Sequence, residues 1–327
     1  MTYAIEAEGL VKSFGATRAL DGVDLHAQQG TVLGVLGPNG AGKTTAVRVL
    51  ATLLHADAGT ARVGGFDVRR DPQRVREVIG LTGQYASVDE DLSGTQNLML
   101  IGTLLDLRRG AARARAAELL RWFDLTDAAD RPAKTYSGGM RRRLDLAASL
   151  VGRPDIIFLD EPTTGLDPVK REDMWGVVRS LVDEGSTVLL TTQYLDEADA
   201  LADEITVIDH GKVIAHDTPS GLKRVVGGKT LEVEPADPSR IAEVTAILRR
   251  VAGAEPELVK RGGVAVAVQD EATMPRVVAQ LDAAGISVTE LSLHLPSLDE
   301  VFFSLTGRRG SDDASRATDP TTEGSAA

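Results

Sequence analysis

The residues best able to do chemistry begin with a glycine-rich segment. Residues 37–45 read GPNGAGKTT and fit the pattern G-x-x-x-x-G-K-[ST]. In such a loop, successive backbone N–H groups turn inward to cradle phosphate oxygens, and the next helix adds its positive N-terminal end. Lys43 can reach the β- and γ-phosphates, and the Thr44 hydroxyl can ligate Mg²⁺. The segment predicts a nucleotide-phosphate site formed by Gly37, Pro38, Asn39, Gly40, Ala41, Gly42, Lys43, Thr44 and Thr45.

A second segment, residues 156–162, reads IIFLDEP and is an apolar run that ends in two carboxylates. The run is typical of a buried parallel strand, so Asp160 should emerge at the carboxyl edge of a sheet, where open α/β sheets bind ligands. There Asp160 can hold Mg²⁺ with its hydration shell, and Glu161 can face the attacking water. Hydrolysis of a phosphoanhydride needs positioned water and charge neutralisation more than covalent chemistry. The two segments together predict an ATPase.

The elements that must position these residues follow a pattern of alternating strands and helices, which predicts a mostly parallel sheet and an α/β fold. A strand over 31–36 runs into the glycine loop and a helix over 44–54 follows it, the context that a phosphate loop requires. Further predicted elements are strands over 3–7, 156–159 and 187–191, helices over 109–123 and 171–183, and a hairpin over 205–215.

The pattern restarts beyond Gly227-Gly228, where strands and helices alternate over 231–305. This predicts a small α+β domain, ferredoxin-like in arrangement. From Arg308 the chain has no aliphatic residue larger than alanine, which indicates a disordered tail. The expected organisation is a first domain over 1–226 with a helical subdomain at about 85–135, a C-terminal domain over 229–307, and a tail over 308–327.

Composition narrows the class of protein. The 327 residues carry a net charge of −12, which argues against a sequence-independent grip on nucleic acid. There is no cysteine, so disulfides and thiolate metal sites are excluded. No segment approaches the roughly 20 apolar residues that span a bilayer. Glu6 and Glu8 stand where a signal peptide would be basic and then apolar. We expect a cytoplasmic protein that reaches a membrane only through a partner.

A third segment, Tyr136–Met140, reads YSGGM and resembles the LSGGQ signature of ATP-binding-cassette (ABC) ATPases. Other elements of that family match in order over about residues 1–225. The resemblance implies that Phe14 stacks on adenine, that Gln84 serves Mg²⁺ and that Asp167 belongs to the D-loop. It also implies an ABC-type domain with a phosphate-loop core sheet, with ATP and Mg²⁺ as cofactors. In the implied homodimer, the signature residues act on the opposite nucleotide: Ser137, Gly138, Gly139 and Met140.

The chain departs from the family pattern at two places, and both departures indicate one branch of the ABC ATPase family. Met140 and Tyr136 replace the signature glutamine and leucine, and Gln193 stands where the family has a switch histidine. Together with residues 83–98 and the LDEVFFSLTG of residues 298–307, they resemble the daunorubicin-resistance type, the ATP-binding subunit of a bacterial multidrug exporter. The resemblance then covers about residues 1–307. It implies a peripheral subunit on the cytoplasmic side of the cell membrane that energises an ABC-2-type permease of several transmembrane helices.

The cargo implied is a hydrophobic drug such as an anthracycline-like antibiotic, bound by the permease rather than by this chain. The same type of ATPase subunit could instead energise the export of complex lipids or glycolipids. A different class, a soluble cassette ATPase acting on nucleic acid or ribosomes, is disfavoured by the acidic balance, the single cassette and the lack of a long coiled-coil insertion. The C-terminal domain could aid dimerisation, brace the permease or regulate it.

Gln193 gives a prediction on turnover. Glutamine can donate a hydrogen bond to a γ-phosphate but cannot become cationic near neutral pH, so the chain should be a slower but active ATPase. Replacement Gln193→His is expected to preserve or raise the rate of ATP hydrolysis, measured as phosphate release at saturating Mg-ATP. Abolished turnover in this variant would refute the assignment of Gln193 as the γ-phosphate sensor.

Overall fold

The computed structural model describes residues 3–83, 88–225, 229–259, 262–268, 270, 272–294 and 296–306. Contacts along the chain divide it into two compact units, residues 1–219 and 220–327. The sequence placed the joint at Gly227-Gly228, within a stretch outside the described residues. The predicted tail over 308–327 and Gln84 also lie outside them. The domain limits given above therefore stay predictions.

The central sheet of the first unit is the predicted, mostly parallel one. Its strand order is β10-β9-β3-β8-β7-β6, and every neighbouring pair is parallel except β9 and β10. The strands β3, β7 and β8 are buried along their whole length, as their apolar sequences predicted. The bounds are β3 (Val32–Leu36), β6 (Ile79–Thr82), β7 (Ile156–Asp160), β8 (Thr187–Thr192), β9 (Glu204–Asp209) and β10 (Lys212–Asp217).

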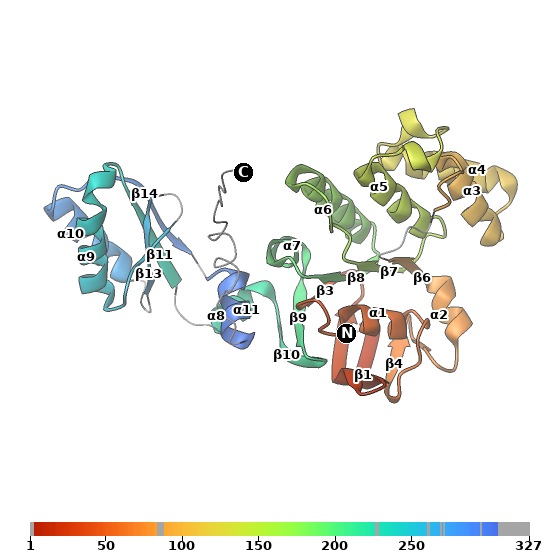
Figure 1. Ribbon diagram of the computed structural model, residues 1–327, viewed down its shortest axis with the longest axis horizontal. Coiled ribbons are helices and arrows are strands. Elements are labelled where there is room, and N and C mark those ends of the chain that lie inside the picture. Colours follow the sequence, from red (N-terminus) through yellow and green to blue (C-terminus); the bar gives the residue numbers. More distant parts are fainter. Residues whose placement is uncertain are drawn as a thin grey trace, which may run out of the picture. The chain divides into compact units, whose positions relative to one another are not determined.

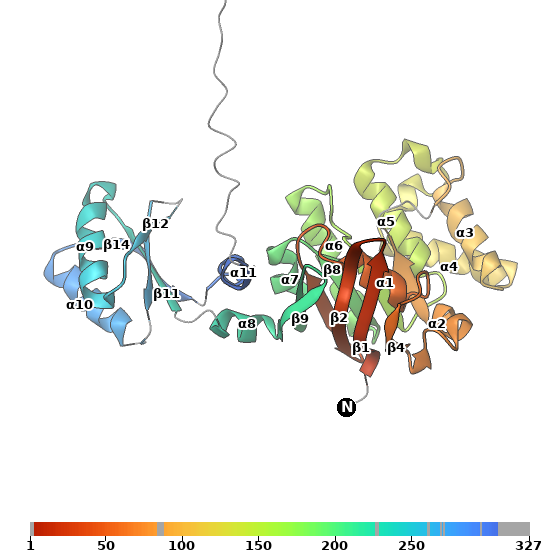
Figure 2. The same cartoon turned by 60° about the horizontal axis from the view of Figure 1, so that its bottom comes forward.

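A second, antiparallel sheet in the first unit was not predicted. It has the order β2-β1-β4-β5, formed by β1 (Tyr3–Phe14), β2 (Thr17–Gln28), β4 (Ala58–Val63) and β5 (Phe66–Asp67), and Figure 2 shows β2, β1 and β4 side by side. Only the first residues of β1 were expected to form a strand. Bulges shift the register between β1 and β2 several times, so apolar residues do not alternate cleanly along either strand.

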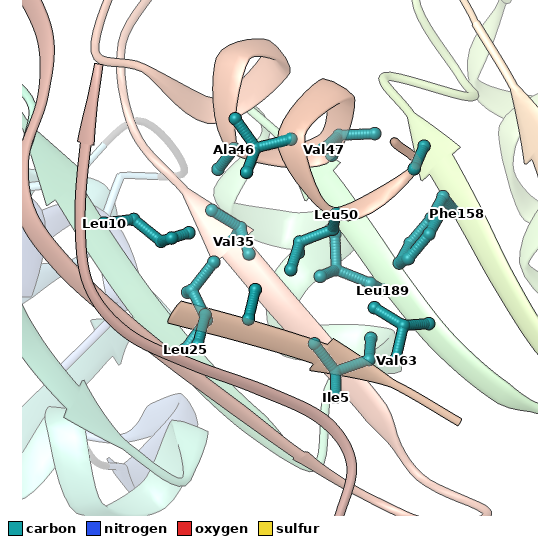
Figure 3. Close-up of a cluster of buried hydrophobic side chains, with 14 of the residues drawn as sticks. Ile5, Leu10, Leu25, Val35, Ala46, Val47, Leu50, Val63, Phe158 and Leu189 are labelled. Atoms are coloured by element: carbon teal, nitrogen blue, oxygen red, sulfur yellow. The ribbon is translucent and has the colours of Figure 1, made fainter. Parts of the chain in front are cut away.

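Helix α1 (Lys43–Leu50) lies between these two sheets and joins their cores. Figure 3 shows Leu50 of this helix among side chains from both sheets, with Val35 and Leu189 of the central sheet and Ile5 of the antiparallel sheet around it. The sequence predicted this helix to continue to residue 54. It ends at Leu50 because Thr52 adopts a left-handed backbone conformation, with φ at 61°, which no α-helix accommodates.

The remaining helices of the first unit include a helical subdomain and the helices that flank the sheet. Helices α3, α4 and α5 gather into one group (Figure 1). Ser93 starts α3 with a capping box completed by Gln96. The bounds are α2 (Pro72–Val78), α3 (Gly94–Leu104), α4 (Arg109–Trp122), α5 (Gly138–Ser149), α6 (Pro168–Asp183) and α7 (Leu195–Leu201).

The second unit is a ferredoxin-like domain, as predicted. The chain runs β-α-β-β-α-β, and its antiparallel sheet has the order β12-β13-β11-β14 with α9 and α10 on one face (Figures 1 and 2). The short strand β12 was not predicted. The bounds are α8 (Pro219–Val225), β11 (Lys229–Pro235), α9 (Ile241–Ala252), β12 (Glu257–Leu258), β13 (Val264–Val268), α10 (Thr273–Ala283), β14 (Val288–His294) and α11 (Leu298–Thr306).

The position of Leu50 between two sheets gives a stability prediction. Its side chain is fully buried, so Leu50→Ala should lower the free energy of unfolding of the first unit by about 2–5 kcal/mol. The matched control is Leu104→Ala, since Leu104 is 75% exposed, and its effect should stay within about 0.5 kcal/mol. Denaturant unfolding can be followed by fluorescence, because both tryptophans of the chain, Trp122 and Trp175, lie in the first unit. Equal losses in the two variants would contradict this account of the core.

Candidate active site

The glycine loop borders a hollow at the carboxyl end of β3. The hollow has a volume of about 320 Å³ and brings the loop together with residues from β2 and from the end of β7. Residues that are far apart in the sequence therefore meet here, as the strand–loop–helix context predicted. Its lining consists of Ala19, Asn39, Gly40, Gly42, Lys43, Thr44, Thr45 and Glu161.

Two glycines of the loop are required by close backbone approaches. Gly42 has φ at 115°, and a Cβ atom on it would lie 2.4 Å from the carbonyl oxygen of Ala19. A Cβ atom on Gly37 would lie 2.2 Å from the carbonyl oxygen of Ile208. Both distances are far shorter than any van der Waals contact. Strands β2 and β9 thus press against the loop and hold its amides in place, so that they can bind phosphate oxygens.

Lys43 is buried beneath the loop, with 3% of its surface exposed. Its Nζ donates to the carbonyl oxygens of Gly37 at 2.7 Å and Pro38 at 3.1 Å, and it forms an ion pair with Glu161 Oε1 at 3.4 Å. Burial lowers the pKa of Lys43, while the charges of Glu161 and Asp160 oppose that shift. The cation therefore sits between the phosphate loop and the carboxylate predicted to orient water.

Oxygen atoms suited to Mg²⁺ meet at Asp160. The Thr44 hydroxyl donates to Asp160 Oδ1 at 3.2 Å, and Asp160 itself is buried. Two ligands at right angles on Mg²⁺, each at about 2.1 Å, lie about 3 Å apart, so this pair fits the ion. Among the described residues no three His, Cys, Asp or Glu side chains gather to hold a metal. A site with few protein ligands suits Mg²⁺, which keeps waters and binds substrate phosphates.

Glu161 is held in a conformation that non-glycine residues rarely adopt. Its φ is 52°, and its backbone N–H donates to the carbonyl and the hydroxyl oxygen of Thr191, at 3.1 Å and 3.2 Å. Thr164 donates to its carboxylate at 3.4 Å. Backbone strain of this kind persists only when surrounding contacts determine it, and it is concentrated at functional sites. The turn points the carboxylate into the hollow beside Lys43.

Thr191 is a functional residue that the sequence analysis missed. Its hydroxyl donates to Asp160 Oδ1 at 2.5 Å and accepts from the backbone N–H of Glu161, so one side chain positions both acidic residues. Because Thr191 lies in a strand that is buried throughout, it was counted only as part of an apolar run. The feature of the sequence that could have identified Thr191 was the pair of adjacent threonines at the end of that run, because buried hydroxyl groups need hydrogen-bond partners.

The signature segment lies at the start of α5 and does not line the hollow at Lys43. Ser137 is the N-cap of this helix, and its hydroxyl accepts from Met140 N at 3.3 Å. Gly138 and Gly139 form the first turn of the helix, so their amides point out of its positive end, as predicted. Tyr136, which replaces the family leucine, is buried and donates from its hydroxyl to Ala128 O at 2.7 Å.

Three other predicted site residues, Phe14, Gln193 and Asp167, do not line the hollow. Phe14 ends β1 with its ring about half exposed, and its adenine contact stays a prediction. Gln193 is partly buried and directly follows β8, one strand from the phosphate loop. Asp167 is the N-cap of α6, where hydrogen bonds from Lys170 lower its pKa. Gln84 lies outside the described residues.

A buried carboxyl group, Glu197 on α7, lies four residues beyond Gln193. Its side chain is inaccessible to solvent, and burial raises its pKa. The side chains of Thr192, Thr163 and Trp175 lie near this carboxyl group, and they act to lower its pKa. Neither carboxyl oxygen completes a hydrogen bond with them, so burial decides the direction of the shift. The carboxyl group of Glu197 lies between the segment after Glu161 and the segment that carries Gln193.

The phosphate loop, the two carboxylates and the signature helix on this fold define an ATP-binding-cassette ATPase. The family model described as ABC transporter matches residues 20–164, and that of the ATP-binding protein DrrA1-3-like C-terminal domain matches residues 218–306. The chain belongs to the family of daunorubicin and doxorubicin resistance ATP-binding proteins. It is 56% identical over 309 residues to daunorubicin resistance ATP-binding protein DrrA2 of Streptomyces coeruleorubidus, covering 94% of this chain and 96% of that protein.

Other comparisons agree with this assignment. The chain is 52% identical over 317 residues to daunorubicin/doxorubicin resistance ATP-binding protein DrrA of Streptomyces peucetius, covering 95% of this chain and 94% of that one. Among solved structures, the ADP conformation of MJ1267, an ATP-binding cassette of an ABC transporter, matches with a TM-score of 0.61 at 27% identity. That match covers 67% of this chain and 92% of the other. The predicted family, fold and ATPase class are thereby confirmed.

This class of protein binds nucleotide and couples ATP hydrolysis to transport. Its members act as dimers together with a membrane permease. Over the ranges that the structure describes, no helix combines the length and the apolar character needed to cross a bilayer.

Glu197 gives a prediction on pH dependence. Its pKa is raised in the folded state above the ordinary value of 4.5, so above that pH the unfolded chain loses this proton first. The stability due to the protonated carboxyl is fully present below 4.5 and is lost as pH rises through the raised value. Glu197→Gln lacks this loss, so its stability relative to the parent should increase from about pH 5 to pH 8.

The measurement is the thermal midpoint of both proteins across that pH range. The matched control is Glu184→Gln, which removes an exposed carboxyl at the end of α6. Parallel stability curves for the parent and Glu197→Gln would contradict the burial of a protonated carboxyl group.

Proposed function

We propose that this chain is the ATP-hydrolysing subunit that energises export of hydrophobic drugs, such as anthracycline-like antibiotics, and so confers resistance. The observation that carries the proposal is its close relation, along nearly the whole of both chains, to proteins named for daunorubicin and doxorubicin resistance. That relation includes the second unit, which matches the family model of a DrrA1-3-like C-terminal domain over residues 218–306. The cassette alone would support transport but no particular cargo.

The proposed division of roles follows from the contacts at the hollow. Lys43 and the loop amides hold the β- and γ-phosphates, while Thr44 and Asp160 hold Mg²⁺. Gln84, which lies outside the described residues, is assigned to the same ion by the family resemblance alone. When bound, Mg²⁺ neutralises charge that develops on the phosphates. Glu161 orients the attacking water and accepts its proton, since its carboxylate is fixed beside Lys43.

Three further roles rest on positions next to that core. Gln193 donates to the γ-phosphate from the end of β8, and Phe14 stacks on the adenine ring. Asp167 of the D-loop caps α6 and sets where that helix begins after the catalytic turn. None of these three side chains lines the hollow at Lys43, so each would act on the outer part of the nucleotide or from its edge.

A head-to-tail homodimer is the second part of the proposal. The signature at Ser137–Met140 presents helix amides that suit γ-phosphate oxygens but does not line the hollow of its own chain. In a head-to-tail pair each signature covers the nucleotide held by the other chain. ATP then closes the dimer and hydrolysis releases it, which supplies a motion that a permease can use.

The partner and the location complete the proposal. Without a described helix able to cross a bilayer, this subunit would act peripherally at the cytoplasmic side of the cell membrane. A multi-helix permease then binds the drug, and this chain binds only nucleotide. The acidic net charge of −12 gives no support for a nucleic-acid partner.

The test is ATP-driven uptake of doxorubicin into inside-out vesicles that carry this chain and the membrane protein encoded beside it. Uptake should require Mg-ATP and should be lost in Glu161→Gln, which removes the charge that orients water while keeping the size of the side chain. That variant should still bind ATP and accumulate as a closed dimer in gel filtration. Lys43→Ala should instead lose nucleotide binding.

Glu172→Gln is the matched control, since it changes an exposed carboxylate on α6, and it should transport like the parent. Full ATPase activity in Glu161→Gln would refute the assigned role of that residue. Vesicles with intact ATPase activity but no doxorubicin uptake would refute the drug cargo and leave a lipid-like cargo as the explanation.

A further inference from the structure

Arg142, on the signature helix α5, is bonded to the segment that carries the catalytic carboxylate. Its guanidinium donates to Pro162 O at 2.9 Å, to Glu161 O at 2.9 Å and to Asp160 O at 3.3 Å. It also donates to Gly83 O at 3.0 Å, the residue before Gln84. One side chain thus supplies hydrogen bonds to the backbone of three consecutive residues at the end of β7 and to the end of β6.

A cavity of about 520 Å³ lies beside these bonds, between residues of the signature helix and residues of the segment that follows β7. Its lining includes Gly138 and Arg142 of that helix, and Glu161 and residues 164–166 of the segment after β7. Beside this cavity, Arg142 joins the first turns of α5 directly to the backbone at Glu161 and at its two neighbours. Its bond to Gly83 adds a contact with the end of β6.

The same bonds complete the support of the unusual turn at Glu161. Thr191 fixes the N–H of that residue, and Arg142 fixes its carbonyl group, so both polar groups of its backbone are held from opposite sides. A left-handed turn at a non-glycine residue relaxes when such contacts are lost. Relaxation would move the Glu161 carboxylate away from Lys43.

The chemistry of the site requires arginine rather than another cation. A planar guanidinium has five donors in a fixed fork and can serve several carbonyls at once, whereas an ammonium acts as a point charge. Burial lowers the pKa of Arg142, and the charges of Asp145, Asp160 and Glu161 oppose that shift. The guanidinium keeps its charge at every physiological pH.

We propose that Arg142 is a positioning residue that couples the signature helix to the catalytic carboxylate of the same chain. When Ser137 binds the nucleotide held by the partner chain, the position of α5 is shifted or fixed. Arg142 transmits this change through its hydrogen bonds to the turn that positions Glu161. Each site then hydrolyses ATP only when the other is filled. The inference rests on the proposed roles of Glu161 and of the signature, and it adds the physical link between them.

The test is a double-mutant cycle on the full chain assembled with its permease, using Ser137→Ala and Arg142→Gln separately and together. Arg142→Gln should lower kcat about 10- to 100-fold, because it misplaces Glu161, and should leave the Kd for ATP nearly unchanged. The two changes should be non-additive, since the loss of Ser137 has little further effect once the link is broken. Arg142→Lys should recover only part of the lost kcat.

The matched control is Arg115→Gln. Arg115 also donates to a backbone carbonyl of the same helix region, Leu150 O at 2.7 Å, but at the opposite end from the signature. Its loss should lower the thermal midpoint without lowering kcat and should combine additively with Ser137→Ala. A merely structural role for Arg142 would make both arginine variants behave alike.

The inference is overturned if Arg142→Gln keeps the parental kcat, or if its effect and that of Ser137→Ala multiply to within about twofold. Failure of the proposed function looks different: Glu161→Gln would then keep full ATPase activity, or the parent protein would take up no doxorubicin, whatever Arg142 does. Thermal midpoints and circular dichroism of every variant ensure that kcat is compared among folded proteins.

Discussion

The arrangement of the first unit depends on one requirement: the buried ammonium group of Lys43 must be surrounded by hydrogen-bond acceptors. Lys43 meets it with two carbonyl oxygens of its own loop and the carboxylate of Glu161. An isolated buried charge would be strongly unfavourable, so these partners must come from separate segments that the fold brings together. The end of β3, the start of α1 and the end of β7 meet for this reason at one edge of the central sheet. The same arrangement leaves a positive charge where the phosphates of a nucleotide would lie.

The antiparallel sheet explains how the phosphate loop keeps its shape. Its strand β2 brings the carbonyl of Ala19 against Gly42, while β9 of the central sheet brings that of Ile208 against Gly37. Helix α1 is fixed between the two sheets by a shared apolar core, so the loop that precedes it cannot open outward. The predicted site for a highly charged ligand thus rests on a closely packed apolar core. The same arrangement of strands forms this core and brings the polar residues of the site together.

The polar contacts around Glu161 connect the segment after β7 with the signature helix. Thr191 holds the backbone N–H of Glu161 and Arg142 holds its carbonyl group, and Arg142 belongs to the helix whose first turn is the signature. Glu197 adds a buried carboxyl group between the turn at Glu161 and the strand end that precedes Gln193. The departures from the common ABC pattern, Tyr136 and Gln193, leave this framework in place. Tyr136 adds an anchor of its own through its bond to Ala128.

The sequence alone determined the class of protein, because phosphate binding and Mg²⁺ binding need particular residue types at fixed spacing within continuous segments. It also determined the parallel strands, whose apolar runs are uninterrupted, and the ferredoxin-like second unit, whose elements alternate regularly. Only the tertiary structure decided the antiparallel sheet, since bulges in β1 and β2 disrupt the alternation that would reveal it. It alone decided the contacts of Thr191 and Arg142, since each forms a hydrogen bond with the backbone of Glu161, from which they lie 30 and 19 residues away in the sequence. Such contacts depend on which chain segments meet in space, and no local pattern of residues records that.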